Sequence, residues 1–310
     1  MTLVTIRQRS VPAMSKVSVC LTHYNRPEKL AATLESLASQ TKAPDEVFVQ
    51  DDCSPNDPTE VARAFQGRFK HFVYERNENN LGMPGNLNKV IRKATGDFVA
   101  NLHDADEFHP QLLEKWVDVL SRYPSAGLVF CGYDAKAKPS PHQTSGRIWI
   151  HDFDECTPGR DFFERVYVGS SSSPIWGTVM VRREVYDRHL PFDARFGMWS
   201  DVDMWMRVCG THDIAYVAEP LIILDNTDTP VRSFHWRKVS IVHSMHFENI
   251  RRLGRDAEQR AAWLAKQRSY SLRAYVRHLV GRATRGDLRG FAGGCLALPR
   301  FVAMTVQGAP

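Results

Sequence analysis

The 310-residue sequence predicts an α/β protein with a central, mostly parallel sheet flanked by helices and a helical C-terminal tail. Two observations predict this class. Up to about residue 131, short runs of β-branched and apolar residues alternate with segments whose apolar residues recur at helical spacing. The chain is also 43% hydrophobic and 24% charged, which is the range of globular proteins that bury a full-sized core.

Strands and helices alternate in the first part of the chain, which indicates βαβ units with helices on both faces of the sheet. The expected strands are 16–22, 45–50, 71–76, 97–102 and 127–131; the expected helices begin at Pro27 and then occupy 59–69, 85–94 and 112–123.

The later part of the chain is less regular. The pattern of residues 132–175 is irregular, and two segments within it, 136–146 and 169–174, are expected to form mobile loops. A strand passing into a helix follows within 176–188, and a further strand is expected at 215–224. Apolar periodicity then predicts helices at 241–254 and 258–283, with a third segment after Asp287. We therefore divide the chain into an N-terminal extension (1–15), a main domain (16–237) and a C-terminal tail (238–310).

Charge is distributed unevenly. From Arg232 to the C-terminus there are 15 Lys+Arg against 4 Asp+Glu, or +11, which leaves 25 against 31, or −6, for residues 1–231. Basic helices with interleaved aromatic and aliphatic residues are typical of segments that bind anionic membrane surfaces. The same pattern also fits helices that pack on the main domain with their arginines in solvent. Nucleic acid is not an expected partner, because the main domain is acidic and contains no nucleic-acid module.

The cysteines and the chain ends favour a cytoplasmic protein. The six cysteines lack a CxxC or paired spacing, which argues against a disulfide framework or a zinc site. The N-terminus has no signal-peptide pattern, and the most apolar tail segment, 293–306, is interrupted by Pro299 and Arg300. We expect a cytoplasmic location, with peripheral contact at the inner face of the cell membrane as the variant that the basic tail suggests.

Polar, loop-forming residues follow four of the expected strands: HYNRP at 23–27, DDCSPND at 51–57, NENNLGMPGN at 77–86 and HDADEF at 103–108. In open α/β sheets, ligands bind at the carboxyl ends of the strands. Any single βα loop can be polar without a function, but four together, two of them with acidic pairs, favour one shared site.

The pair Asp104 and Asp106 predicts a cation site. In an extended chain their side chains point to the same side, about 6.6 Å apart along the strand. Two partly desolvated carboxylates repel each other, and the repulsion raises a pKa unless a cation joins them. Mg²⁺ or Mn²⁺ suits such oxygens, and Mg²⁺ in proteins is commonly held by one or two carboxylates plus substrate phosphates. Either aspartate fits the role of principal ligand.

The second acidic pair is Asp51 and Asp52. A carboxylate at this strand end can accept hydrogen bonds from a ribose hydroxyl or a base N–H. The structural alternative is an Asx-turn or a helix N-cap.

Three segments together resemble the family-2 glycosyltransferases with a GT-A fold: VSVCLTHYNRPEKLAATLESLASQTKAPDEVFVQDDCSPND, NENNLGMPGNLNKVIRKATGDFVANLHDADEFHP and PFDARFGMWSDVDMWMRV. The resemblance covers roughly residues 16–235. It implies a nucleotide-diphosphate sugar as donor, a UDP-sugar above all, a divalent Mg²⁺ or Mn²⁺, and inversion at the anomeric carbon. It also implies a saccharide or lipid-linked acceptor in bacterial-type surface polysaccharide or glycolipid synthesis.

The resemblance also implies roles for individual residues. Asp201 would be the catalytic base, and residues 16–131 and 132–237 would be the nucleotide-sugar half and the acceptor and base half. The nucleotide-sugar would be contacted by Asp52, Asp51, Thr22, Tyr24, Arg26 and Asp104, and the metal would be held by Asp104, Asp106 and His235.

A physical argument separately favours Asp201 over Asp203. Two residues apart on a helix, they point about 200° from each other, so only one can face a given pocket. Asp201 shares its face with Trp205, and a carboxylate beside an aromatic wall has its pKa raised toward the range useful for a general base. A helix N-terminal carboxylate without a catalytic role is the alternative.

Two departures from the family pattern bear on function. Ser200 precedes Asp201 where Glu-Asp is common, and the Gln-x-x-Arg-Trp signature of processive synthases is absent, which favours addition of a single sugar. A sugar nucleotidylyltransferase is an alternative, but it would need a glycine-rich loop after the first strand, and HYNRPEK contains no glycine. A non-catalytic sugar-nucleotide or glycan-binding protein on the same fold is a second alternative.

Overall fold

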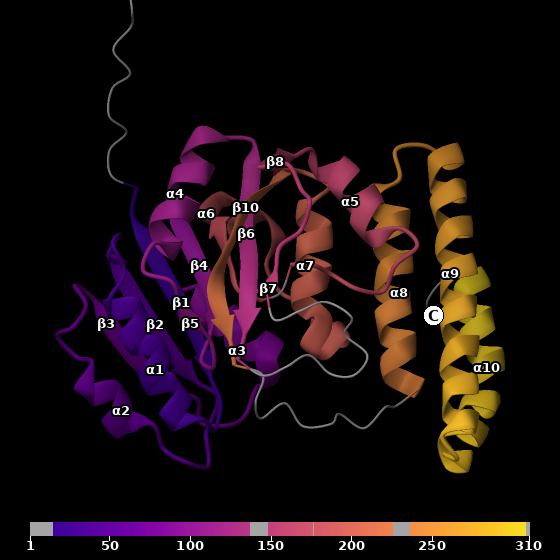
Figure 1. Cartoon of the computed structure of the whole chain (residues 1–310), viewed down its shortest axis with the longest axis horizontal. Coiled ribbons are helices and arrows are strands. Elements are labelled where there is room, and N and C mark those ends of the chain that lie inside the picture. The colour runs from indigo at the N-terminus through magenta and orange to yellow at the C-terminus, as the bar shows by residue number, and fades with distance from the viewer. Residues whose placement is uncertain (1–14, 137–147, 176, 226–235, 308–310) are drawn as a thin grey trace, which may run out of the picture.

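The structure, a computed structural model, describes residues 15–136, 148–175, 177–225 and 236–307. Its centre is a ten-stranded sheet whose main path runs β3-β2-β1-β4-β9-β6-β10-β5, with β7 and β8 paired to β6 and β10. Helices cover both faces of this sheet, and three C-terminal helices lie along one side of the molecule (Figure 1). This arrangement confirms the expected mostly parallel α/β fold with a helical tail.

The first four long strands are parallel neighbours. They are β1 (Val17–His23), β2 (Glu46–Asp51), β3 (Phe72–Arg76) and β4 (Phe98–His103). Every residue of β2 is buried, as expected for a strand covered on both faces. The chain winds outward from β1 to β3 and then returns to place β4 on the other side of β1. In open α/β sheets, ligands bind beyond the carboxyl ends of the strands at such a reversal of strand order, which here lies beside β1.

The second half of the sheet is mixed. β6 (Ala126–Ala135) and β10 (Asp213–Leu224) are parallel, whereas β9 (Val179–Arg182) runs antiparallel between β4 and β6. Three two-residue strands complete the sheet: β5 (Glu107–Phe108), β7 (Ile148–Trp149) and β8 (Cys156–Thr157).

The helices fall into two layers around two apolar cores. One core contains the apolar sides of α1 (Pro27–Ala38) and α4 (Leu112–Arg122). The other contains residues of α3 (Gly82–Ile91), α5 (Gly159–Tyr167), α6 (Arg183–His189), α7 (Ser200–Val208) and α8 (Trp236–Leu253). A 3₁₀ helix, η1 (Ala194–Trp199), leads directly into α7.

Two expectations about local structure differ from the fold. Helix α2 (Thr59–Ala64) ends earlier than expected, because Gly67 adopts φ = 96° and the chain turns there. Helix α5 lies between the two expected loops, where the irregular sequence pattern had indicated neither a helix nor a strand. Its polar surface hides two buried aromatic residues, Phe162 and Phe163, which anchor it to the sheet.

The tail packs on the main domain and does not extend away from it. Met245, Ile250 and Leu253 of α8 lie in the same core as α7, and Trp263 of α9 (Ala257–Thr284) contacts Phe163 with ring centroids 5.5 Å apart. Helix α10 (Leu288–Gln307) closes a smaller apolar cluster with α8 and α9. Within the described residues, no helix combines the length and apolar character that a bilayer span requires. The boundary after residue 237 stays a prediction.

Candidate active site

Two loops that follow β1 and β2 are joined by hydrogen bonds at the carboxyl edge of the sheet. The Asn25 amide donates to the Ser54 hydroxyl at 2.8 Å, and the Asn56 amide donates to the Asn25 side chain at 3.2 Å. Asn25 and Cys53 both have positive φ, 58° and 61°. Non-glycine residues in this region are uncommon and cluster at functional sites, so the joined loops mark this edge of the sheet as a site.

Asp104 connects the end of β4 to the loop after β1. Its side chain is 2% exposed, and Oδ2 lies 2.7 Å from His23 Nδ1 and accepts the Tyr24 amide at 3.1 Å. Oδ1 accepts a hydrogen bond from Arg26 Nη2 at 2.7 Å. Both oxygens of this buried carboxylate are therefore engaged by groups of the β1 loop.

Asp106 lies in a different environment. Its carboxyl is buried, and Oδ2 accepts a hydrogen bond from the Thr178 hydroxyl at 3.0 Å. Burial raises the pKa of Asp106 to about 7, and the charges of Asp104 and Asp225 add to the rise. Among the described residues, no cationic side chain is hydrogen-bonded to this carboxyl, whereas Asp104 is bonded to Arg26.

Asp201 lies in the first turn of α7 and is also buried. Burial raises its pKa to about 7, although Oδ1 accepts the Val202 amide at 2.7 Å. A Cβ added to Gly177 would lie 3.4 Å from Asp201 Oδ2 and only 2.2 Å from His103 Nε2. The side chains of His103 and Asp201 thus meet at Gly177, where only glycine fits.

Gly177 and Thr178 connect the two buried carboxyls. Thr178 holds Asp106, and the preceding residue contacts Asp201. The chain therefore places a buried aspartate from the end of β4 and another from the start of α7 against consecutive residues of one short segment. The sequence indicated both aspartates separately but gave no sign that they share this segment.

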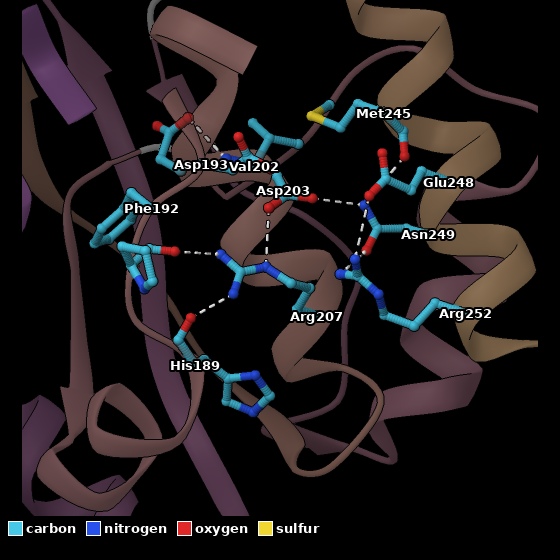
Figure 2. A network of polar contacts seen from close by, with 12 residues as sticks. His189, Phe192, Asp193, Val202, Asp203, Arg207, Met245, Glu248, Asn249 and Arg252 are labelled. Carbon is cyan, nitrogen blue, oxygen red and sulfur yellow. Dashed lines mark hydrogen bonds and ion pairs between the residues drawn. The ribbon is translucent and has the colours of Figure 1, made fainter. Parts of the chain in front are cut away.

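Asp203 points away from this site. Its oxygens accept hydrogen bonds from Arg207 Nε at 2.9 Å and from Asn249 Nδ2 at 2.8 Å (Figure 2). The two aspartates of α7 therefore have separate environments, as the helical geometry requires.

Asp51 and Asp52 organise the loops at the nucleotide end of the predicted site. Asp51 accepts the Ser54 amide at 3.3 Å and Arg76 Nε at 3.1 Å. Asp52 accepts Asn77 Nδ2 at 2.9 Å and the Leu81 amide at 2.7 Å. These contacts stabilise the loops but are neither an Asx-turn nor a cap of α2, since Ser54 is three residues after Asp51 and the partners of Asp52 are 25 and 29 residues away. The contact with a nucleoside stays a prediction.

The other residues expected at the nucleotide lie at the same edge. Thr22 is half-buried and pairs with His103 in the parallel register of β1 and β4, and the Tyr24 side chain is 46% exposed. Arg26 reaches Asp104 from the same loop. The third expected metal ligand, His235, lies outside the described residues.

The residues present fit a divalent cation in one respect. Within the described ranges, no three His, Cys, Asp or Glu side chains form a group that could hold a metal by themselves. Asp106, however, is a buried carboxyl with a raised pKa, and in the part of the chain that the structure describes no cationic side chain is bonded to it. Such a group is stabilised by a cation. Asp104 is already neutralised by Arg26. Asp106 is therefore the better candidate for principal metal ligand.

Three residues of the site were missed by sequence reasoning: His103, Gly177 and Thr178. His103 directly precedes the acidic pair and could have been included for that reason. Gly177 and Thr178 follow a serine-rich stretch that reads as a loop. Only the antiparallel placement of β9 beside β4 brings them to the site.

Comparison with known proteins gives one family. Residues 18–190 match the model described as glycosyl transferase family 2. An uncharacterized glycosyltransferase of Methanocaldococcus jannaschii is 25% identical over 64% of this chain and 66% of its own length. The abequosyltransferase RfbV of Salmonella typhimurium is 25% identical over 67% of this chain and 66% of its own length. The GalNAc(5)-diNAcBac-PP-undecaprenol beta-1,3-glucosyltransferase of Campylobacter jejuni is 34% identical over 30% of this chain and 31% of its own length. The alignments thus span about two thirds of these relatives or less.

Two solved structures share the fold. S. aureus TarS 1-349 in complex with UDP-GlcNAc has a TM-score of 0.59 at 15% identity and covers 92% of each chain. The mannosyltransferase PcManGT from Pyrobaculum calidifontis, in complex with GDP-Man and Mn²⁺, has a TM-score of 0.57 at 18% identity and covers 95% of this chain and 85% of its own. Since the family model spans more than half of the sequence and the fold is that of GT-A enzymes, the chain belongs to glycosyl transferase family 2.

Proposed function

We propose that this protein transfers one sugar from a nucleotide-diphosphate donor to a hydroxyl of a saccharide or lipid-linked acceptor, with inversion. The observation that carries the proposal is the pair of buried carboxyls, Asp106 and Asp201, held against Thr178 and Gly177. Both have pKa values of about 7, well above the usual range of an aspartate. Such raised pKa values lower the stability of the fold at neutral pH and are typical of catalytic or binding groups.

Asp201 acts as the general base. A base with a pKa near the working pH combines a substantial ionised fraction with a strong drive to take up a proton. As the acceptor oxygen forms its bond to the anomeric carbon, the bond from that carbon to the diphosphate breaks and Asp201 receives the hydroxyl proton. A single displacement of this kind inverts the anomeric centre.

Asp106 and Asp104 serve the diphosphate side of the site. Asp106, with Asp104 and His235 as further ligands, would hold Mg²⁺ or Mn²⁺, and a bound divalent ion stabilises negative charge on a departing diphosphate. Arg26 supplies positive charge at the same edge, where its side chain is 44% exposed. The manganese complex of PcManGT supports this reading of the donor site.

The donor and the acceptor follow from similar proteins. Complexes of fold relatives with UDP-GlcNAc and GDP-Man support a nucleotide-sugar donor, for which we propose a UDP-sugar contacted by Asp52, Asp51, Thr22 and Tyr24. The names of the Salmonella and Campylobacter relatives support an acceptor in surface polysaccharide or glycolipid synthesis. The absence of the processive signature supports addition of a single sugar.

The outer face of the tail supports contact with an anionic membrane surface. Helix α10 has two charged residues, Arg289 and Arg300, and most of its other residues are apolar or small. One side packs on α8 and α9, yet Leu288 and Leu296 on the other side are 72% and 82% exposed. Exposed apolar side chains beside cationic ones are typical of helices that bind a membrane surface. Since residues 232–310 carry +11, a bilayer with acidic lipids at the cytoplasmic face suits this surface.

Substitution of Asp201 by Asn tests the proposed chemistry. The amide keeps the shape of the side chain but cannot accept the proton, so we expect donor binding to persist and turnover to fall by about 10²- to 10⁴-fold. Donor affinity would be measured by calorimetry and turnover by release of nucleoside diphosphate. Asp187→Asn, on the exposed surface of α6, is the matched control. Turnover within twofold of the unmodified enzyme would refute Asp201 as the base.

A further inference from the structure

Asp203 anchors helix α7 to the tail. Its side chain is 3% exposed, and its two oxygens accept hydrogen bonds from Arg207 and from Asn249 of α8 (Figure 2). Asn249 is fully buried and its amide also donates to the Met245 carbonyl at 3.1 Å. A buried carboxylate with both oxygens bonded fixes the distance and the rotation of α7 relative to α8.

Arg207 extends this connection to the chain before α7. Its guanidinium donates to the carbonyls of His189 and Pro191, the second at 3.1 Å (Figure 2). These carbonyls belong to the end of α6 and the segment that leads toward η1. Asp203, Arg207 and Asn249 thus connect three parts of the chain through one buried ion pair.

Helix α8 contacts the base-bearing segment at two more points. Glu248 accepts a hydrogen bond from Arg195 of η1 at 3.1 Å, one turn before α7 begins. After α7 ends, a Cβ added to Gly210 would lie 2.3 Å from Leu253 Cδ2, so α8 approaches there as closely as glycine permits. The contacts of α8 therefore lie before, within and after α7.

From these contacts we propose that Asn249 is a positioning residue for the transfer reaction, holding α7 so that Asp201 faces Gly177 and the reacting hydroxyl. The proposal rests on the assignment of Asp201 as base in the proposed function. Asn249 lies about 60 residues beyond the segment that matches the family model, in the part of the chain that its composition marks as a basic tail. Its side chain donates to Asp203 and to the Met245 carbonyl and accepts a hydrogen bond from Arg252, so its effect on Asp201 passes through Asp203.

The expected effect follows from how sensitive proton transfer is to geometry. A misplacement of about 1 Å in a catalytic group can lower the rate by about 10²-fold. Donor contacts at the ends of β1, β2 and β4 do not involve α7, so donor affinity should be insensitive to this displacement. Loss of kcat with unchanged donor affinity is therefore the signature of positioning, whereas general destabilisation would affect both.

Asn249→Ala is the first test. We expect kcat to fall by about 10- to 100-fold, with the donor dissociation constant unchanged within twofold at a temperature well below the unfolding midpoint. Ile250→Val is the control, because it also shortens a buried α8 side chain, by one methyl group, but leaves the Asp203 network intact. Equal kcat in the two variants would overturn the proposal.

Exchange of the two partners is the second test and remains informative if Asn249→Ala does not fold. Asn249→Asp alone places two carboxylates together, and Asp203→Asn alone weakens the pair with Arg207. In the double variant, the amide at position 203 can donate to the carboxylate at position 249. Multiplying the two single-variant reductions in kcat predicts a kcat for the double variant. We expect the measured kcat to exceed that predicted value by about tenfold, because the two residues are coupled through one network. A double-variant kcat equal to the predicted value would contradict a direct connection between Asp203 and Asn249.

The outcome separates this inference from the proposed function. If Asp201→Asn retains turnover, the base is assigned wrongly and the proposed chemistry fails. If Asp201→Asn loses turnover while Asn249→Ala and the exchange variants behave like the Ile250→Val control, the chemistry stands and Asn249 is only a structural residue.

Discussion

At the scale of single residues, the site contains two aspartates that oppose folding when they ionise. An ordinary aspartate has a pKa near 3.8, whereas Asp106 and Asp201 have pKa values of about 7 in the folded protein. The folded state therefore retains protons that the unfolded chain releases. Their stabilising effect is complete below pH about 4 and is lost as the pH rises through 7. The protein thus gives up stability at neutral pH to hold two reactive carboxyls.

Asp106→Asn should stabilise the metal-free protein, and more so at higher pH. The amide removes the cost of ionising a buried carboxyl, so the difference in unfolding free energy from the unmodified protein should grow between pH 5 and pH 8, to an order of 3 kcal/mol. Urea unfolding at several pH values would measure it. Burial lowers the pKa values of histidines such as His243 and His246, so these residues make the unfolding free energy rise with pH. Because both proteins contain them, this contribution cancels when the unmodified protein is subtracted from the variant.

The same variant tests the cation. If Asp106 is the principal ligand, Mn²⁺ with nucleoside diphosphate should raise the unfolding midpoint of the unmodified protein and have little effect on Asp106→Asn. Asp187→Asn should respond like the unmodified protein. An undiminished response of Asp106→Asn to Mn²⁺ would move the cation to other ligands.

The sequence predicts residues at this scale only where chemistry is local. Acidic pairs directly after buried strands identified Asp104 and Asp106, and helical geometry separated Asp201 from Asp203. Which of the two β4 aspartates is compensated could not be predicted, because it depends on Arg26, about 80 residues away in the chain. Gly177 could not be recognised either, since its importance comes from side chains of β4 and α7.

At the scale of elements, helix α8 belongs energetically to the main domain. Its periodicity was visible in the sequence, but an amphipathic helix that packs on a protein and one that binds a membrane have the same pattern. The structure shows Met245, Ile250 and Leu253 buried in the core with α7. Because these side chains are buried against the main domain, the change in charge near residue 237 does not indicate which residues the folded domain needs for stability.

A chain that ends at residue 237 should fail to fold cooperatively. Loss of three large buried side chains, at about 2 to 5 kcal/mol each, approaches the 5 to 15 kcal/mol that stabilises a typical domain. A chain that ends at residue 286, which keeps α8 and α9, should fold with a lowered midpoint and retain donor binding. Circular dichroism melting of both chains would decide. A cooperative, active chain ending at 237 would show that α8 is dispensable and would also remove the role of Asn249.

At the scale of the whole molecule, the two sides differ in charge and in surface character. The first 231 residues carry −6 and contain the candidate site residues other than His235, whereas residues 232–310 carry +11 and include the exposed apolar side chains of α10. Helices α9 and α10 lie at the outer side of the molecule, away from β1, β2 and β3 (Figure 1), so α10 can meet a surface without covering those strands.

The full-length protein should bind vesicles that contain phosphatidylglycerol and release them as salt rises, because charges are screened beyond about 8 Å at physiological ionic strength. Leu288→Glu with Leu296→Glu should reduce binding at least tenfold. Ile148→Glu, at an apolar position that is 56% exposed and lies outside the tail, is the control. Equal binding by all variants, or none by any, would refute the membrane contact. A dimer that the paired substitutions dissociate would identify a second copy of the chain as the partner.

The bond between Asp203 and Asn249 has a consequence for how such enzymes can be recombined. A hybrid of two relatives that joins one parent to the other between these positions would pair a buried carboxylate with a foreign helix. A junction before residue 200 or after residue 254 would inherit both partners from the same parent. Libraries of chimeric enzymes should therefore tolerate exchange on either side of this interval, and exchange within it only when both parents carry a compatible pair.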